Sequence, residues 1–197
     1  MIHFDPGEAP RRAAIFGGTF DPVHRGHLAM AAKAREVAGL DRVCFVPARV
    51  SPFKDKPVAN NMQRLTMLKI ALRESGFAWA EASDIELERA SVPSFSWQTA
   101  RQFAITCPET EWFWILGSDQ WEQIEQWAEP EMLRDLLHFL VFTRDEQPIR
   151  ERRNWQYTAI PFAHPASATA IRADFARHRD WLLPGVFQYC QESRLYT

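Results

Sequence analysis

The chain has 197 residues, of which 46% are hydrophobic, and a formal net charge of −2 at pH 7. This length and composition predict a single domain over residues 1–197 with enough apolar side chains for a core. The small net charge gives no general attraction to nucleic acid or to an anionic membrane, so neither is expected as a partner. The longest apolar runs, such as residues 112–116, are too short to span a bilayer.

The cysteines and the N-terminal residues predict where in the cell the protein is located, but they predict no functional site. Cys44, Cys107 and Cys190 are widely spaced and form no CxxC pair, so neither a zinc site nor a disulfide framework is predicted. No residue of the chain is assigned as a metal ligand. The first residues lack the basic and then apolar pattern of a signal peptide. A reducing cytoplasm is therefore the expected location.

The first part of the chain alternates strand-like and helix-like segments, as in a parallel sheet covered by helices. Residues 13–16 are apolar and predict a first strand, which leads through a turn into a helix over 28–34. Residues 42–47 predict a second strand. A helix over 62–73 carries its leucines on one stripe, and Arg64 is expected on its surface.

The rest of the chain continues this alternation. Residues 112–116 are apolar throughout, which is typical of a strand that is buried on both faces. Two polar segments, 47–60 and 145–154, are expected to be loops, and the first is expected to be mobile and beside the site. The other elements are, in chain order, an extended segment over 77–87, a helix over 96–106, strands over 139–143 and 158–160, and helices over 170–177 and 184–191. We therefore predict an α/β fold of Rossmann-like type, a doubly wound parallel sheet in three layers, α/β/α.

The turn after the first strand, residues 17–27, reads GGTFDPVHRGH and carries the strongest functional signal. Its glycines let backbone N–H groups approach an anion closely, and the start of a helix favours negative charge. Histidines three residues apart share a helix face, so His24 and His27 can point at one ligand. The turn therefore predicts a phosphate site with two imidazole donors. A packed histidine pair or a fragment of a zinc site would show the same spacing, but no third ligand at a fitting distance is found.

Two other segments are expected at the same edge of the sheet, because ligands bind beyond the carboxyl ends of parallel strands. Residues 117–119 read GSD and follow the strand over 112–116, and residues 166–172 read ASATAIR and follow the last predicted strand. Ser167 or Thr169 can cap the helix that follows. Its free N–H groups and Arg172 would form a second anion site, so that a polyphosphate could lie between two helix N-termini.

These segments resemble those of a known enzyme family. GGTFDPVHRGH resembles the HxGH signature of the nucleotidylyltransferase superfamily, and ASATAIR is similar to its second signature, ISSTxIR. Three further features resemble the bacterial nicotinate mononucleotide adenylyltransferases: SPFK at 51–54, QRLTML at 63–68, and GSD at 117–119 followed by Trp127. The resemblance spans nearly the whole chain.

The resemblance implies adenylyl transfer from ATP to nicotinate mononucleotide, which gives nicotinate adenine dinucleotide and pyrophosphate in NAD biosynthesis. His24 and His27 would donate to the α- and β-phosphate oxygens, and Lys54 and Arg172 would hold the β- and γ-phosphates. Magnesium would accompany ATP. The implied ATP-binding residues are Gly17, Gly18, Thr19, Phe20, Gly26, Gly117, Asp119, Ser167, Thr169 and Ile171.

The same resemblance implies where the pyridine mononucleotide lies. Trp127 would stack on the pyridine ring, Arg144 would meet the mononucleotide phosphate, and Ser96 and Ala128 would complete this side of the site. Asp119 would contact the adenosine ribose.

The sequence departs from the family pattern at several positions, and these departures keep alternatives open. Phe53 stands where the family has a histidine, Ala48 where it has an asparagine, and Phe95-Ser96 where it has tyrosine and threonine. One alternative is a nucleotidylyltransferase with a different phosphate-monoester acceptor. The other is a nucleotide-binding protein with little catalysis. The choice between nicotinate and nicotinamide, and a homo-oligomeric state, stay open.

Overall fold

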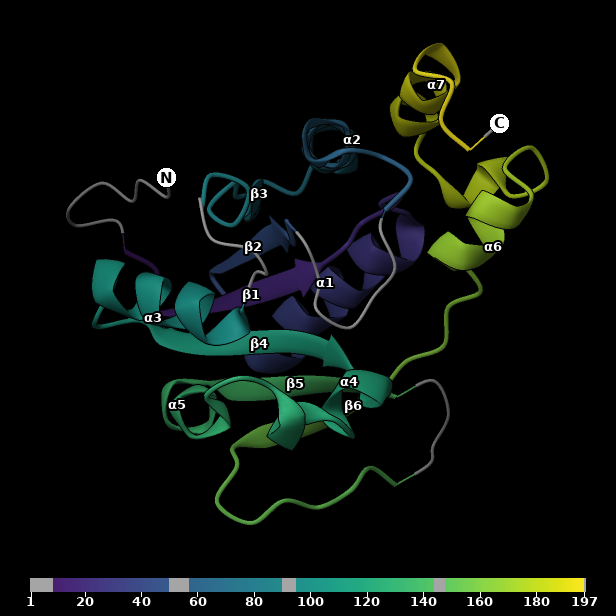
Figure 1. Ribbon diagram of the computed structural model, residues 1–197. Coiled ribbons are helices and arrows are strands. Elements are labelled where there is room, and N and C mark those ends of the chain that lie inside the picture. Colours follow the sequence, from purple (N-terminus) through teal and green to yellow (C-terminus); the bar gives the residue numbers. More distant parts are fainter. Residues whose placement is uncertain (1–8, 50–56, 90–94, 144–147, 197) are drawn as a thin grey trace.

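The computed structural model describes residues 9–49, 57–89, 95–143 and 148–196 (Figure 1). Six strands form one sheet in the order β3-β2-β1-β4-β5-β6, and every neighbouring pair is parallel. The strands are β1 (Arg12–Gly18), β2 (Arg42–Pro47), β3 (Ala80–Ala82), β4 (Glu111–Gly117), β5 (His138–Thr143) and β6 (Tyr157–Pro161). The strand order reverses between β1 and β4, which confirms the predicted doubly wound α/β fold.

Helices cover both faces of the sheet (Figure 1). Ala14 and Phe16 of β1 belong to a hydrophobic core that the sheet forms with α1, α2, α6 and α7. The alternate residues Ala13 and Ile15 belong to a second core, which the sheet forms with α3, α4 and α5. The helices are α1 (Arg25–Ala38), α2 (Asn61–Ser75), α3 (Ser96–Thr106), α4 (Ser118–Trp121), α5 (Pro130–Leu136), α6 (Ala168–Ala173) and α7 (Pro184–Glu192), with 3₁₀ turns η1 (Ile124–Gln126) and η2 (Arg179–Trp181). The sheet is thus the middle of three layers.

Some predicted elements differ from those observed. The extended segment predicted over 77–87 is a strand only at β3, because Leu87 closes a turn onto the Asp84 carbonyl at 2.8 Å. The helix predicted over 170–177 ends at Ala173, and the Asp174 carboxylate then accepts the Arg177 N–H at 3.1 Å. The short elements α4, η1 and α5 were not predicted, because they are too short for a helical period to show.

Arg64 is the largest departure from the sequence prediction. Its side chain is completely buried in α2, so the prediction that it lies on the surface is wrong. The guanidinium donates to the carbonyls of Thr19 and Ala48 and to Asn61 Oδ1, each at 2.7 Å. These bonds compensate for taking the charge out of water, although burial still lowers the pKa of Arg64. The residue ties the turn after β1 to the segment after β2.

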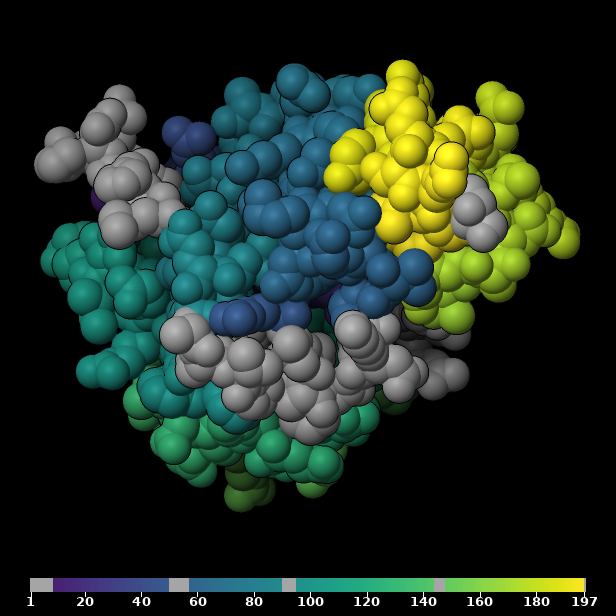
Figure 2. Space-filling model, turned by 45° about the horizontal axis from the view of Figure 1, so that its top comes forward, coloured from purple at the N-terminus to yellow at the C-terminus, as the bar shows by residue number. Residues whose placement is uncertain are grey.

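The last described residues return to that same turn. Helix α7 packs against α2, and in Figure 2 the yellow C-terminal residues lie against the blue residues around α2. From there the Tyr196 hydroxyl donates to Asp21 Oδ1 at 2.5 Å. The buried Asp21 carboxylate also accepts the N–H groups of Val58 and Ala59, at 2.8 and 3.0 Å. Among the described residues, no helix is long and apolar enough to cross a membrane.

Candidate active site

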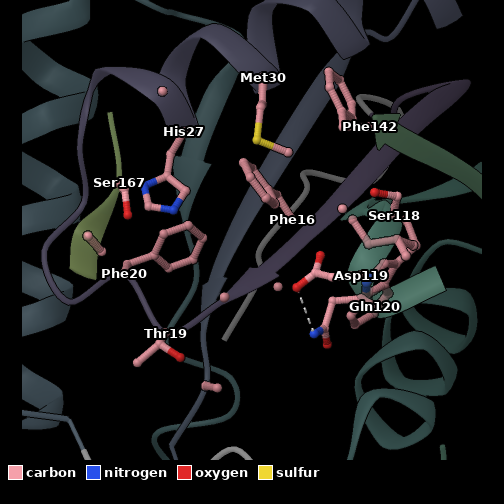
Figure 3. A pocket seen from close by; sticks show the side chains of 18 of the residues that line it. Phe16, Thr19, Phe20, His27, Met30, Ser118, Asp119, Gln120, Phe142 and Ser167 are labelled. Atoms are coloured by element: carbon pink, nitrogen blue, oxygen red, sulfur yellow. Dashed lines mark hydrogen bonds between the residues drawn. The ribbon is translucent and has the colours of Figure 1, made fainter. Parts of the chain in front are cut away.

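A cleft of about 1370 Å³ opens at the carboxyl ends of the strands. It lies across the boundary between β1 and β4, where the strand order reverses. Figure 3 shows His27, Phe20 and Ser167 on one side of this cleft, and Ser118, Asp119 and Gln120 on the other. Ligand pockets are usually roughly 300–1000 Å³, so this cleft has room for more than one nucleotide.

The turn after β1 is shaped by a close contact between Gly18 and Phe20. Phe20 has a left-handed backbone conformation, with φ of 51°, which folds its buried ring back over Gly18. A Cβ atom on Gly18 would lie only 2.8 Å from that ring, so no larger residue fits without a shift. The ring also meets His27 edge-on, with 5.0 Å between ring centroids. The Phe20 ring thereby holds the His27 imidazole at the wall of the cleft.

The two predicted histidines lie together at the start of α1. His24 is the N-cap residue, and the ring centroids of His24 and His27 are 3.8 Å apart in a stacked arrangement. The His24 backbone N–H donates to His27 Nδ1 at 3.2 Å. Because Nδ1 accepts this bond, the proton of a neutral His27 ring is on Nε2, which can donate to a ligand. The pair is therefore built as a set of donors at a helix N-terminus.

Burial sets the charge of His24. The ring is buried, and burial together with the neighbouring His164 lowers the pKa of His24 to about 3. The free ring is neutral at physiological pH, and it can donate only one N–H hydrogen bond. Negative charge from a phosphate group at this position would raise that pKa again.

Arg172 and Asp21 join the second predicted anion segment to the first. Arg172 Nη1 donates to the Asp21 carbonyl at 2.7 Å, and Nη2 donates to Thr169 Oγ1 at 3.4 Å. These bonds fix the guanidinium at the wall of the cleft, beside Ser167. Asp21 shapes the loop through its carboxylate and carbonyl, in agreement with the turn role that an Asp-Pro pair suggests.

The other side of the cleft carries the predicted adenosine and pyridine contacts. Asp119 lies in the first turn of α4, and its carboxylate accepts a hydrogen bond from Gln120 Nε2 at 3.4 Å (Figure 3). Trp127 is half-buried and meets Trp114 edge-on, with 6.3 Å between ring centroids. Its Nε1 has no hydrogen-bond partner within the described part of the chain. Trp127 thus offers an aromatic surface on the cleft wall.

Arg152 anchors the segment that leads to Trp127. Its side chain is buried, although residues 145–154 were expected to form a surface loop. Arg152 Nη2 donates to the carbonyls of Trp121 and Glu122, each at 3.1 Å, and Nη1 lies 2.5 Å from a Glu125 carboxylate oxygen. Most other described residues of this segment are exposed, and the Arg152 side chain alone is buried, because its acceptors cluster around the end of α4.

The structure brings most of the predicted site residues to one cleft. Ile171 is an exception, because its side chain is completely buried in the core and its N–H bonds to the Ser167 carbonyl at 3.0 Å. Lys54 and Arg144 lie outside the described residues. The predicted residues that line the cleft are Gly17, Gly18, Thr19, Phe20, His24, Gly26, His27, Ser96, Gly117, Asp119, Trp127, Ala128, Ser167, Thr169 and Arg172.

Sequence reasoning missed His164, which also lines the cleft. Its only signal in the sequence is its position three residues before Ser167, and it belongs to neither signature. Arg64 and Tyr196 were missed as well. Both act on the site indirectly, Arg64 through the Thr19 carbonyl and Tyr196 through the Asp21 carboxylate.

Comparison with known proteins agrees with this geometry. The sequence model of the cytidylyltransferase-like family matches residues 15–174. A probable nicotinate-nucleotide adenylyltransferase of Methylacidiphilum infernorum is 36% identical over 190 residues, covering 94% of this chain and 92% of that protein. The nicotinate-nucleotide adenylyltransferase of Bacillus subtilis is 31% identical over 190 residues, covering 94% of this chain and 98% of that one.

A solved structure agrees at the level of the fold. Plasmodium falciparum nicotinic acid mononucleotide adenylyltransferase, complexed with NaAD, superposes with a TM-score of 0.78 at 19% identity. The match covers 94% of this chain and 97% of that chain. Together with the family model and the sequence relatives, the two signatures at one cleft place the chain in a family. The chain belongs to the cytidylyltransferase-like family and, within it, to the nicotinate-nucleotide adenylyltransferases.

Proposed function

We propose that this chain transfers the adenylyl group of ATP to nicotinate mononucleotide, forming nicotinate adenine dinucleotide and pyrophosphate in NAD biosynthesis. The observation that carries the proposal is the stacked pair His24 and His27 at the start of α1, in a cleft that also presents Asp119 and Trp127. The sequence relatives that bear the name of this enzyme support the same reaction.

The reaction needs positioning and charge stabilisation more than covalent work by the protein. An oxygen of the acceptor's 5′-phosphate forms a bond to the α-phosphorus of ATP. The bond from that phosphorus to the bridging oxygen breaks, and pyrophosphate leaves. His27 Nε2–H and the N–H groups at the start of α1 counter the negative charge that builds on the phosphate oxygens. His24 lies beside them as a second donor.

The roles proposed for the other site residues follow the resemblance to the family, and the positions of Arg172, Asp119 and Trp127 in the cleft wall support them. Arg172 holds the triphosphate, Asp119 contacts the adenosine ribose, and Trp127 stacks on the pyridine ring. Lys54 and Arg144 are proposed for the β- and γ-phosphates and for the mononucleotide phosphate, respectively.

Magnesium is proposed to enter with ATP. In the part of the chain that the structure describes, no three His, Cys, Asp or Glu side chains are grouped to hold a metal ion. Magnesium often binds through substrate phosphates and a few waters, with at most one or two carboxylates from the protein. The donor set therefore fits a magnesium ion that the triphosphate itself carries, and the ion would neutralise the leaving pyrophosphate.

The direct test is pyrophosphate release with Mg²⁺ and ATP, measured with nicotinate mononucleotide, with nicotinamide mononucleotide and with no acceptor. Turnover that depends on nicotinate mononucleotide is the expected result. Turnover only with another phosphate monoester would replace the acceptor in this proposal. Tight ATP binding with no turnover on any acceptor would favour a nucleotide-binding role.

A further inference from the structure

A third imidazole lies at the start of α1, and neither signature includes it. His164 belongs to the segment between β6 and α6, and its half-buried ring lines the cleft. A Cβ atom built on Gly26 would lie 3.1 Å from His164 Nδ1 and 3.0 Å from His24 Nδ1. Both rings therefore lie against the first turn of α1 at Gly26, where a larger residue would be in tight contact with each of them.

One hydrogen bond fixes which nitrogen of His164 carries the proton. The backbone N–H of Ala166 donates to His164 Nδ1 at 3.1 Å. A nitrogen that accepts a hydrogen bond is unprotonated in the neutral ring, so the proton is on Nε2. The ring also stacks on Phe162, with an interplanar angle of 8° and 6.2 Å between ring centroids. The orientation of the Nε2–H donor is thus set by its own loop.

The surroundings favour the neutral form of His164 in the free protein. Partial burial lowers the pKa of His164, and the neighbouring His24 is also neutral at physiological pH. The rings of His24 and His164 can lie close together because neither carries a charge that would repel the other. A group with several acceptor oxygens and negative charge can accept a hydrogen bond from each ring.

We propose that His164 is a further triphosphate-binding residue, whose Nε2–H donates a hydrogen bond to an ATP phosphate oxygen at the start of α1. The inference rests on the proposed function for the identity of the nucleotide. It adds a donor from the β6–α6 segment to the two donors of the β1–α1 turn.

Two substitutions separate this role from a structural one. In His164→Gln the side-chain amide nitrogen can take the place of Nε2, so the donor toward the phosphate is kept. In His164→Asn the side-chain oxygen can take the place of Nδ1, so the bond from Ala166 is kept and the distal donor is lost. His178→Asn is the matched control, because this ring stacks on Trp181 and is not among the residues that line the cleft.

The readout is the dissociation constant of ATP, measured by calorimetry, and that of adenosine, measured by competition. We expect His164→Asn to weaken ATP binding about ten- to hundredfold, the range for a hydrogen bond to a charged group, with adenosine binding unchanged. His164→Gln and His178→Asn should stay within about threefold of the original protein. Wild-type ATP affinity in His164→Asn would overturn the inference, as would equal weakening of ATP and adenosine.

The binding measurement needs no turnover, so the two proposals fail separately. If the unmodified protein releases no pyrophosphate with nicotinate mononucleotide, the proposed function fails, whatever the His164 variants do. If it turns over and His164→Asn binds ATP normally, only the role of His164 fails.

Discussion

Replacing the buried arginine of α2 gives the sharpest test of how the site is held together. In Arg64→Met the side chain keeps most of its apolar stem but ends short of the guanidinium position and loses every N–H donor. The carbonyls of Thr19 and Ala48, which now accept part-buried bonds of 2.7 Å, would lose these donors. Each unsatisfied buried acceptor costs about 1–3 kcal/mol. We therefore expect a clear loss of stability.

The size of the loss follows from two opposing effects. Two orphaned carbonyls would together cost about 2–6 kcal/mol, and removing the buried charge returns part of its desolvation cost. We expect the free energy of unfolding to fall by about 2–4 kcal/mol, which for a chain of this size lowers Tm by about 5–15 °C. Without the bond from Arg64 to the Thr19 carbonyl, the turn after β1 is held less firmly, so KM for ATP should also rise.

The assay is urea unfolding followed by tryptophan fluorescence, with steady-state kinetics on the same samples. Lys69→Met is the matched control, because Lys69 is exposed on the same helix, and a change within about 0.5 kcal/mol is expected for it. A loss in Arg64→Met that does not exceed the control would refute the reasoning, since it would mean that these carbonyls find other partners at no cost.

Three further predictions concern the turn after β1. His27→Ala should lower kcat about 10²–10³-fold with the fold intact, because it removes a donor to developing charge, as measured by pyrophosphate release and circular dichroism. His24 has a pKa of about 3 in the folded state and 6.5 in the unfolded state, so between these values only the unfolded state gains a proton as the pH falls. This costs up to about 1.4 kcal/mol of unfolding free energy per pH unit. His24→Asn removes this cost, so its unfolding free energy, measured in urea at several pH values, should fall less steeply on acidification. Tyr196→Phe should lower the free energy of urea unfolding by about 1–2 kcal/mol, because Asp21 loses one donor and keeps the N–H groups of Val58 and Ala59.

Each of these predictions has an outcome that contradicts it. A near-normal kcat in His27→Ala would place His27 outside the reacting groups. Parallel pH curves for the original protein and His24→Asn would show that His24 titrates alike in the folded and unfolded states. An unchanged unfolding free energy in Tyr196→Phe would mean that the contact with Asp21 contributes nothing net.

The sequence by itself predicted most of the strands and helices and pointed to His24 and His27 as the candidate reacting groups. The helix over 96–106 and the strand over 42–47 are observed with their predicted bounds. The apolar run over 112–116 forms the middle of β4. These predictions succeed because strand and helix periods are local properties of the chain. His24 and His27 are three residues apart, so their shared helical turn follows from the spacing alone.

Only the tertiary structure decided how the cleft is held and which other groups reach it. Tyr196 and Asp21 are separated by 175 positions, and Arg64 bonds to a carbonyl 45 positions away. Such contacts depend on which face of each helix is buried against the sheet and on where each strand ends. The local periodicity of the sequence encodes neither of these. His164 lies near His24 for the same reason, because parallel strands bring the segments after β1 and β6 to one edge of the sheet.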